Sequence, residues 1–97
     1  MASGMNYYSG SFVGTGSSLD VKLPGFQPKY VKLRTSVIEL EWWEGMPAAS
    51  GLKSVNHDST QLSLVTSNGI TPLADGFTIG TDSVNGSGTV CYFLALA

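Results

Sequence analysis

The sequence predicts an all-β fold: an antiparallel β-sandwich or small barrel of about seven to eight strands. Twelve glycines and four prolines divide the 97 residues into short segments. These segments are rich in Val, Ile, Leu, Thr, Tyr and Phe, and they alternate between apolar and polar residues as a half-buried strand requires. A helix is disfavoured even over Ser36–Glu44, which lacks Gly and Pro, because β-branched and aromatic residues dominate this stretch.

The first half of the chain contains two clear alternating stretches. Leu19–Leu23 places its apolar side chains on one face and its two charged side chains on the other, and Pro24-Gly25 ends it. Lys29–Trp43 alternates in the same way, and its phase requires a short turn or bulge at Thr35-Ser36. This longer stretch is therefore two strands or one bent strand.

The second half predicts three more strands separated by turns. Gln61–Thr66 is the first of them, and Asn68-Gly69 signals a tight turn after it. Gly76–Gly80 is a short strand, and the loop that follows it has Asn85-Gly86 at its tip. Thr89–Ala97 is apolar along most of its length, which predicts a largely buried closing strand.

The chain has room for one domain with a modest core. We expect this single β domain over residues 9–97, after an N-terminal arm over residues 1–8. Met5, Tyr7 and Tyr8 make the arm too apolar for a free tail, which indicates docking on a neighbouring subunit. Only 12% of the residues are charged. Because the usual share is about 25%, we expect a partner to cover part of the surface.

Charge and composition argue against several classes of partner. Five basic residues against seven acidic ones provide no basic patch for a nucleic-acid backbone. The longest apolar run, Val90–Ala97, is far shorter than the roughly 20 residues of a membrane-spanning helix, so no membrane partner is expected. The single cysteine cannot form an internal disulfide, and the first residues lack the features of a secretory signal. Synthesis in a cytoplasm is therefore expected.

No pattern of residues indicates catalysis or metal binding. His57 and Asp58 are adjacent, so along a strand they face opposite ways. Asp75 and Asp82 belong to no calcium-loop pattern and are better explained as turn-stabilising residues. Cys91 lies in an apolar alternation, where a thiol is typically a small buried hydrophobe. We therefore expect a protein that is not an enzyme and has no metal site and no cofactor.

Trp42-Trp43 is the pair most suggestive of binding. Adjacent residues of a strand face opposite sides, so if Trp42 fills the core, Trp43 points outward. An outward tryptophan serves protein interfaces or stacks on a sugar, although packing under a loop at the rim explains it equally well. The predicted interface residues are Met5, Tyr7, Tyr8 and Trp43.

Four segments, which together make up a little over a third of the chain, carry a resemblance: Tyr8–Gly16, Leu23–Leu33, Phe77–Thr81 and Val84–Ala95. They resemble small β-domains of tailed-bacteriophage virion proteins. The second segment contains a Gly-Phe-x-Pro turn, and the last two are similar to the closing hairpin of those domains. Lys29 stands where such domains often carry an acidic residue, and residues 35–76 have no counterpart in them.

The resemblance implies a virion component. Such domains occur in tail-fibre and in capsid-associated proteins, and a fibre would need an attachment region and a shaft, so the short chain favours the capsid. We expect a capsid decoration (cement) protein on the virion surface, a homo-oligomer with a trimer favoured, which stabilises contacts between major capsid proteins. The alternative is a tail or fibre tip module that binds host surface glycan. An unrelated β-sandwich binding module and, last, a small hydrolase are the remaining alternatives.

Overall fold

The computed structural model describes residues 6–55 and 62–97 and confirms the predicted all-β class. These residues form eight strands in one antiparallel sheet, ordered β1-β8-β3-β4-β5-β6-β7-β2, which curls into a half-barrel. In chain order the elements are β1 (Tyr7–Val13), β2 (Leu19–Lys22), β3 (Tyr30–Arg34), β4 (Ile38–Trp43), β5 (Ser50–Val55), β6 (Leu62–Leu73), β7 (Gly76–Ile79), the 3₁₀ turn η2 (Ser83–Asn85) and β8 (Val90–Leu96).

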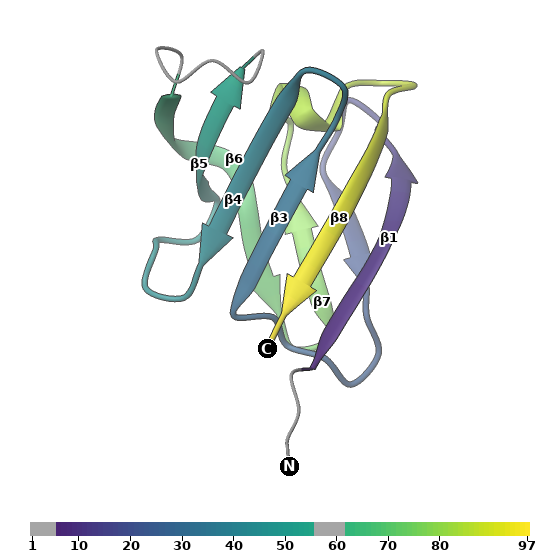
Figure 1. Cartoon of the computed structure of the whole chain (residues 1–97), viewed down its shortest axis with the longest axis vertical. Helices are drawn as coiled ribbons and strands as arrows, with labels where there is room; N and C mark the ends of the chain where they lie inside the picture. Colours follow the sequence, from purple (N-terminus) through teal and green to yellow (C-terminus); the bar gives the residue numbers. More distant parts are fainter. Residues whose placement is uncertain (1–5, 56–61) are drawn as a thin grey trace.

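The sheet folds over itself into two layers (Figure 1). The front layer consists of β1, β8, β3 and β4, and β7 and β2 lie behind it. β5 and β6 continue the sheet from one layer to the other. Because of this curl, the two end strands of the sheet, β1 and β2, lie along the same side of the molecule.

The core fills the space between the layers. On β3 and β4 every second residue faces inward, as the alternation over Lys29–Trp43 predicts. Phe77 of the back layer packs edge-to-face on Phe93 of the front layer, with 5.7 Å between ring centroids. The buried apolar residues are Leu23, Phe26, Val31, Leu33, Leu40, Trp42, Ile70, Phe77, Ile79, Val84, Cys91 and Ala95.

A buried threonine forms the turn between β3 and β4. The Oγ1 atom of Thr35 accepts hydrogen bonds from the backbone N–H groups of Val37 (3.3 Å) and Ile38 (3.0 Å). The Thr35 N–H donates in turn to the Ile38 carbonyl at 2.8 Å. The turn predicted at Thr35-Ser36 is confirmed, and this stretch is two strands rather than one bent strand.

The tight turn predicted at Asn68-Gly69 is wrong, because β6 runs through both residues. Ser50 pairs with Ile70 while the next residue of β5 pairs with Val65, so residues 66–69 form a bulge on β6. A Cβ atom on the glycine of this bulge would lie 2.5 Å from the Ser50 carbonyl oxygen. The Asn-Gly pair therefore bends a long strand at the point where β6 leaves β5 to pair with β7.

Asn85, expected at the tip of a loop, is fully buried. Its side-chain oxygen accepts a hydrogen bond from the Thr15 N–H at 3.0 Å. Its side-chain nitrogen donates to the carbonyls of Ser17 (2.6 Å) and Gly80 (3.0 Å). One side chain thus joins the β1–β2 connection to the end of β7.

Asp82 stabilises the η2 turn, as predicted for it. Its carboxylate accepts a hydrogen bond from the Val84 N–H at 3.0 Å. It also pairs with the Lys53 ammonium of β5 at 3.2 Å, and both side chains are largely buried. Lys53 donates a second hydrogen bond to the Ser83 hydroxyl at 2.7 Å. The second aspartate considered above, Asp75, forms an exposed ion pair with a lysine at 3.7 Å.

β1 takes in two residues that the sequence analysis assigned to an N-terminal arm. Tyr7 and Tyr8 pair with Leu96 and Ala95 of β8. The sheet therefore begins two residues before the boundary expected at residue 9. Met5 lies outside the described residues.

Cys91 points into the core and has no exposed surface, in line with its apolar sequence context. Burial raises the pKa of its thiol to about 11. A hydrogen bond from the Arg34 backbone lowers the pKa, but by less than burial raises it. Between about pH 9 and pH 11 the folded chain keeps this proton and the unfolded chain releases it, so stability falls as the pH rises. We expect a loss of up to about 3 kcal/mol from this group across that window.

Denaturant unfolding under reducing conditions, from about pH 8 to pH 11, measures this loss. The control is Cys91→Ala, which removes the thiol and keeps the other groups that titrate at high pH. Its free energy of unfolding should depend less steeply on pH than that of the wild type. The same slope in both proteins would show that Cys91 does not couple folding to pH.

Candidate interaction surface

The front layer turns one face toward the core and the other away from it. Directly paired residues lie on the same face, so the registers of the four strands align the outward residues in rows. This outer face consists of Tyr7, Ser9, Ser11 and Val13 of β1, Val90, Tyr92, Leu94 and Leu96 of β8, Tyr30, Lys32 and Arg34 of β3, and Glu39, Glu41 and Trp43 of β4.

Large apolar side chains gather on the β1 and β8 part of the outer face. We define them as the β1–β8 stripe: Tyr7 (63% exposed), Val13 (58%), Val90 (48%), Tyr92 (63%) and Leu94 (36%). The solvent-facing side of an antiparallel sheet is normally polar. A stripe of this kind is therefore a candidate interaction surface.

The stripe exists because β8 is apolar on both faces. Cys91 and Ala95 face the core, whereas Val90, Tyr92 and Leu94 face outward. The prediction of a largely buried closing strand is therefore wrong for the outer face. Within the described part of the chain, no second layer covers this face.

A charged band on β3 and β4 borders the stripe. Arg34 lies 3.2 Å from the Glu39 carboxylate, and Lys32 lies directly across from Glu41. The Tyr30 hydroxyl donates a hydrogen bond to Glu41. Burial, this hydrogen bond and the nearby carboxylates raise the pKa of Tyr30 well above its usual value, so the hydroxyl stays protonated. The band is thus balanced in charge, and Arg34 forms an ion pair with Glu39 within it.

The structure brings two of the four sequence-predicted interface residues onto the outer face. Tyr7 and Trp43 lie at opposite ends of one row, separated by Leu96 and Tyr30. Trp43 is 44% exposed, whereas Trp42 faces the core, as the alternation of the strand requires. Tyr8 faces the other side of the sheet.

Tyr8 packs against the core side of the molecule instead of the stripe. Its ring meets that of Phe26 edge-to-face, with 5.0 Å between centroids. It remains 38% exposed, because β1 lies at the end of the sheet. The side chain thus belongs to the rim of the core rather than to the outer face.

Sequence reasoning missed the members of the stripe other than Tyr7. Val90, Tyr92 and Leu94 carry a signal: both faces of β8 are apolar, which is expected either of a strand covered twice or of an interface strand. Alternation alone cannot separate these two cases. The structure decides between them, because Val90, Tyr92 and Leu94 are exposed and no strand of the described sheet lies over them.

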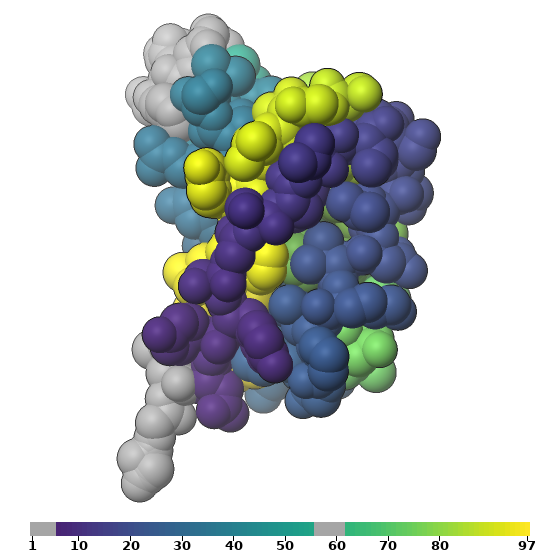
Figure 2. Space-filling view, turned by 90° about the vertical axis from the view of Figure 1, so that its right-hand side faces the viewer, coloured from purple at the N-terminus to yellow at the C-terminus, as the bar shows by residue number. Residues whose placement is uncertain are grey.

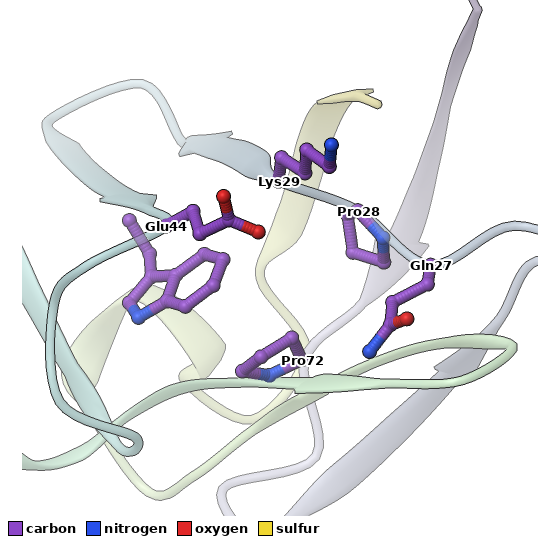
Figure 3. A pocket seen from close by; sticks show the side chains of 6 residues that line it. Gln27, Pro28, Lys29, Glu44 and Pro72 are labelled. Carbon is purple, nitrogen blue, oxygen red and sulfur yellow. The ribbon is translucent and has the colours of Figure 1, made fainter.

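A small pocket lies on the molecule near β4 (Figure 3). Its volume is about 280 Å³, below the 300 to 1,000 Å³ or so of most small-molecule sites. Trp42 in its wall is 4% exposed, and its indole N–H donates to the Pro47 carbonyl at 3.3 Å. Little of this ring is left for a ligand. The lining residues are Gln27, Pro28, Lys29, Trp42, Glu44 and Pro72.

The described residues contain no group of three or more His, Cys, Asp or Glu side chains that could hold a metal ion. His57 and Asp58, considered above for acid–base chemistry, lie outside those residues. In the same part of the chain, no helix is long and apolar enough to cross a membrane.

Comparison with known proteins identifies no relative: no protein-family model, curated protein or solved structure matches the chain. The resemblance of its segments to phage virion domains stays a prediction. The role of the outer face has to be argued from its own geometry and composition.

Proposed function

We propose that this protein is a bacteriophage capsid decoration protein, which binds the outer surface of the head through its outer face and acts without catalysis. The β1–β8 stripe carries the proposal, because its five exposed apolar side chains occur in a chain with only 12% charged residues. The resemblance to phage virion domains suggests the partner, the major capsid protein. Both arguments point to a chain that functions when covered.

In this proposal the stripe provides affinity and the charged band provides orientation. Burial of apolar surface contributes about 25 cal/mol per Å² before the costs of association. Charged groups at the border of an interface select the partner and the register more than they add affinity. An oligomer that contacts adjacent capsid proteins gains avidity, and its binding free energy opposes their separation.

The direct test is the number of copies of this protein in purified virions, measured by quantitative mass spectrometry against the major capsid protein. A near-stoichiometric ratio is expected. A small ratio would favour the tail or fibre tip alternative, and absence from particles would contradict both.

A single substitution tests the stripe itself. We expect Tyr92→Ser to lower the affinity for heads at least about tenfold, because the ring is 63% exposed and its loss leaves the core unchanged. Val37→Ser is the matched control: it also removes an exposed apolar side chain, but from the β3–β4 turn outside the stripe. Head-binding titrations of the two variants should differ. Equal losses, or none, would exclude the stripe as the contact surface.

A further inference from the structure

The free edge of β1 presents backbone hydrogen-bonding groups. Among the described strands, β1 pairs only with β8. The Gly14 N–H donates to the Thr89 carbonyl (2.7 Å), and the Ala97 N–H donates to the Asn6 carbonyl (3.2 Å), so even-numbered residues at both ends of β1 bond to β8. Because bonding directions alternate along a strand, the free edge carries the N–H and C=O groups of Tyr7, Ser9, Ser11 and Val13.

This edge is open to another molecule. Figure 2 shows β1 uncovered across one side of the molecule, between β8 and the segment that contains β2. Of its seven residues only Phe12 is half-buried, and the others are exposed. β1 also pairs with β8 without any register shift, so no bulge blocks the edge.

β1 lacks the features that usually protect an edge strand from pairing. Natural sheets protect their edges with short strands, charged residues, prolines or bulges. At the other end of the sheet, β2 has four residues and carries Asp20 and Lys22. β1 has seven residues, of which none is charged and none is proline. The contrast between the two edges singles out β1 as the one suited to strand addition.

The sequence of β1 is close to a palindrome about its central residue, Gly10. Matching positions on the two sides hold residues of the same kind: two serines, two aromatic residues, and a tyrosine with a β-branched valine. In order from the centre these pairs are Ser9 and Ser11, Tyr8 and Phe12, and Tyr7 and Val13. A two-fold axis through Gly10 would therefore bring each side chain opposite a compatible one.

We infer that the protein forms a two-fold dimer in which β1 pairs antiparallel with β1 of a second copy, centred on Gly10. In this register Ser9 lies opposite Ser11 of the second copy, and Tyr7 lies opposite its Val13. The backbone N–H and C=O groups of all four residues point to the free edge. The four residue pairs therefore form about eight hydrogen bonds, two for each pair. Tyr8 stacks near Phe12 of the second copy on the opposite face, as cross-strand aromatic pairs do.

The packing around Gly10 agrees with this central position. A Cβ atom on Gly10 would lie 3.1 Å from the Phe93 ring, so the ring occupies the place of the missing side chain. The two Gly10 residues therefore carry no side chains that could clash with each other across the axis.

Pairing through β1 joins the two front layers into one continuous sheet, and the β1–β8 stripes of the two copies meet across the axis. This assembly goes beyond the proposed function, because it holds whatever partner the outer face binds. It also differs from the trimer that the phage resemblance implies.

Sedimentation equilibrium of the full chain, at concentrations up to about 0.1 mM, tests the inference. The expected mass is twice the 10.2 kDa of one chain. Ser11→Pro removes one edge-facing N–H and leaves the bonds to β8 in place, and prolines are tolerated at such edge positions. It should weaken dimerisation at least about tenfold, whereas the control Ser11→Ala keeps the N–H and should dimerise like the wild type.

Two further measurements test the dimer even if the proline variant does not fold. The double variant S9K/S11K keeps the backbone intact but sets ammonium groups opposite each other across the axis, so it should be monomeric with an unchanged circular dichroism spectrum. Amide exchange at positions 9 and 11 should be slow in the wild-type dimer and fast in this variant. A wild-type monomer or trimer, or a dimer that survives S9K/S11K, would overturn the inference.

Discussion

Gly76→Ala is expected to lower the free energy of unfolding by about 4 kcal/mol or more, a large part of the roughly 5 to 15 kcal/mol that holds a domain together. Gly76 has a φ of +144°. A Cβ atom there would lie 2.0 Å from the Val21 carbonyl oxygen and 3.0 Å from the Leu23 nitrogen. Gly76 pairs with Lys22 in the β2–β7 ladder, so β2 would have to move away from β7.

Gly88→Ala separates this crowding from the cost of the backbone conformation. Gly88 also has a positive φ, +77°, but a Cβ atom added to it would meet nothing within 4 Å. Its replacement should cost only about 1 to 2 kcal/mol. Urea unfolding of both variants provides the comparison, and similar losses would show that the contact with β2 is not tight.

The strands were predictable where one face of the sheet is buried and the other is exposed to solvent. In Lys29–Trp43 the inward residues form an unbroken alternation, and Thr35 marks the turn by its position between the two halves. The Asn68-Gly69 pair misled because its usual hairpin role depends on the pairing of the flanking residues. In this chain β5 and β7 pair with β6 on either side of it, so the strand bends and continues.

The candidate surface was predictable only in part, for a related reason. Trp43 could be proposed as an interface residue because it follows a buried residue in a strand. Tyr7 could be proposed because it lies in an apolar N-terminal segment. Tyr92 and Leu94 could not, because an apolar residue on each face of a strand has the same sequence signature whether a second layer or a partner covers it. Strand order and the curl of the sheet are long-range properties, and among the described residues they leave the outer side of β8 without a covering layer.

Asn85→Ala is expected to cost about 3 to 4 kcal/mol, since it removes three hydrogen bonds and leaves their backbone partners to find new ones near the core. The partners are the Thr15 N–H and the carbonyls of Ser17 and Gly80. Water can replace the bonds to Thr15 and Ser17 more easily than the bond to Gly80, because Thr15 and Ser17 are exposed and Gly80 is half-buried. The midpoint of thermal unfolding should fall by roughly 15 °C for a domain of this size.

Asn85→Ala also has a local consequence, because Asn85 forms hydrogen bonds to the segment that connects β1 in the front layer with β2 in the back layer. Amide exchange at Thr15 should speed up by more than the global loss of stability requires. Ser87→Ala, an exposed change two residues away, should stay within about 0.5 kcal/mol of the wild type. If Asn85→Ala also stayed within that range, the hydrogen bonds of the buried amide would add no stability. Apolar packing alone would then hold the two layers together.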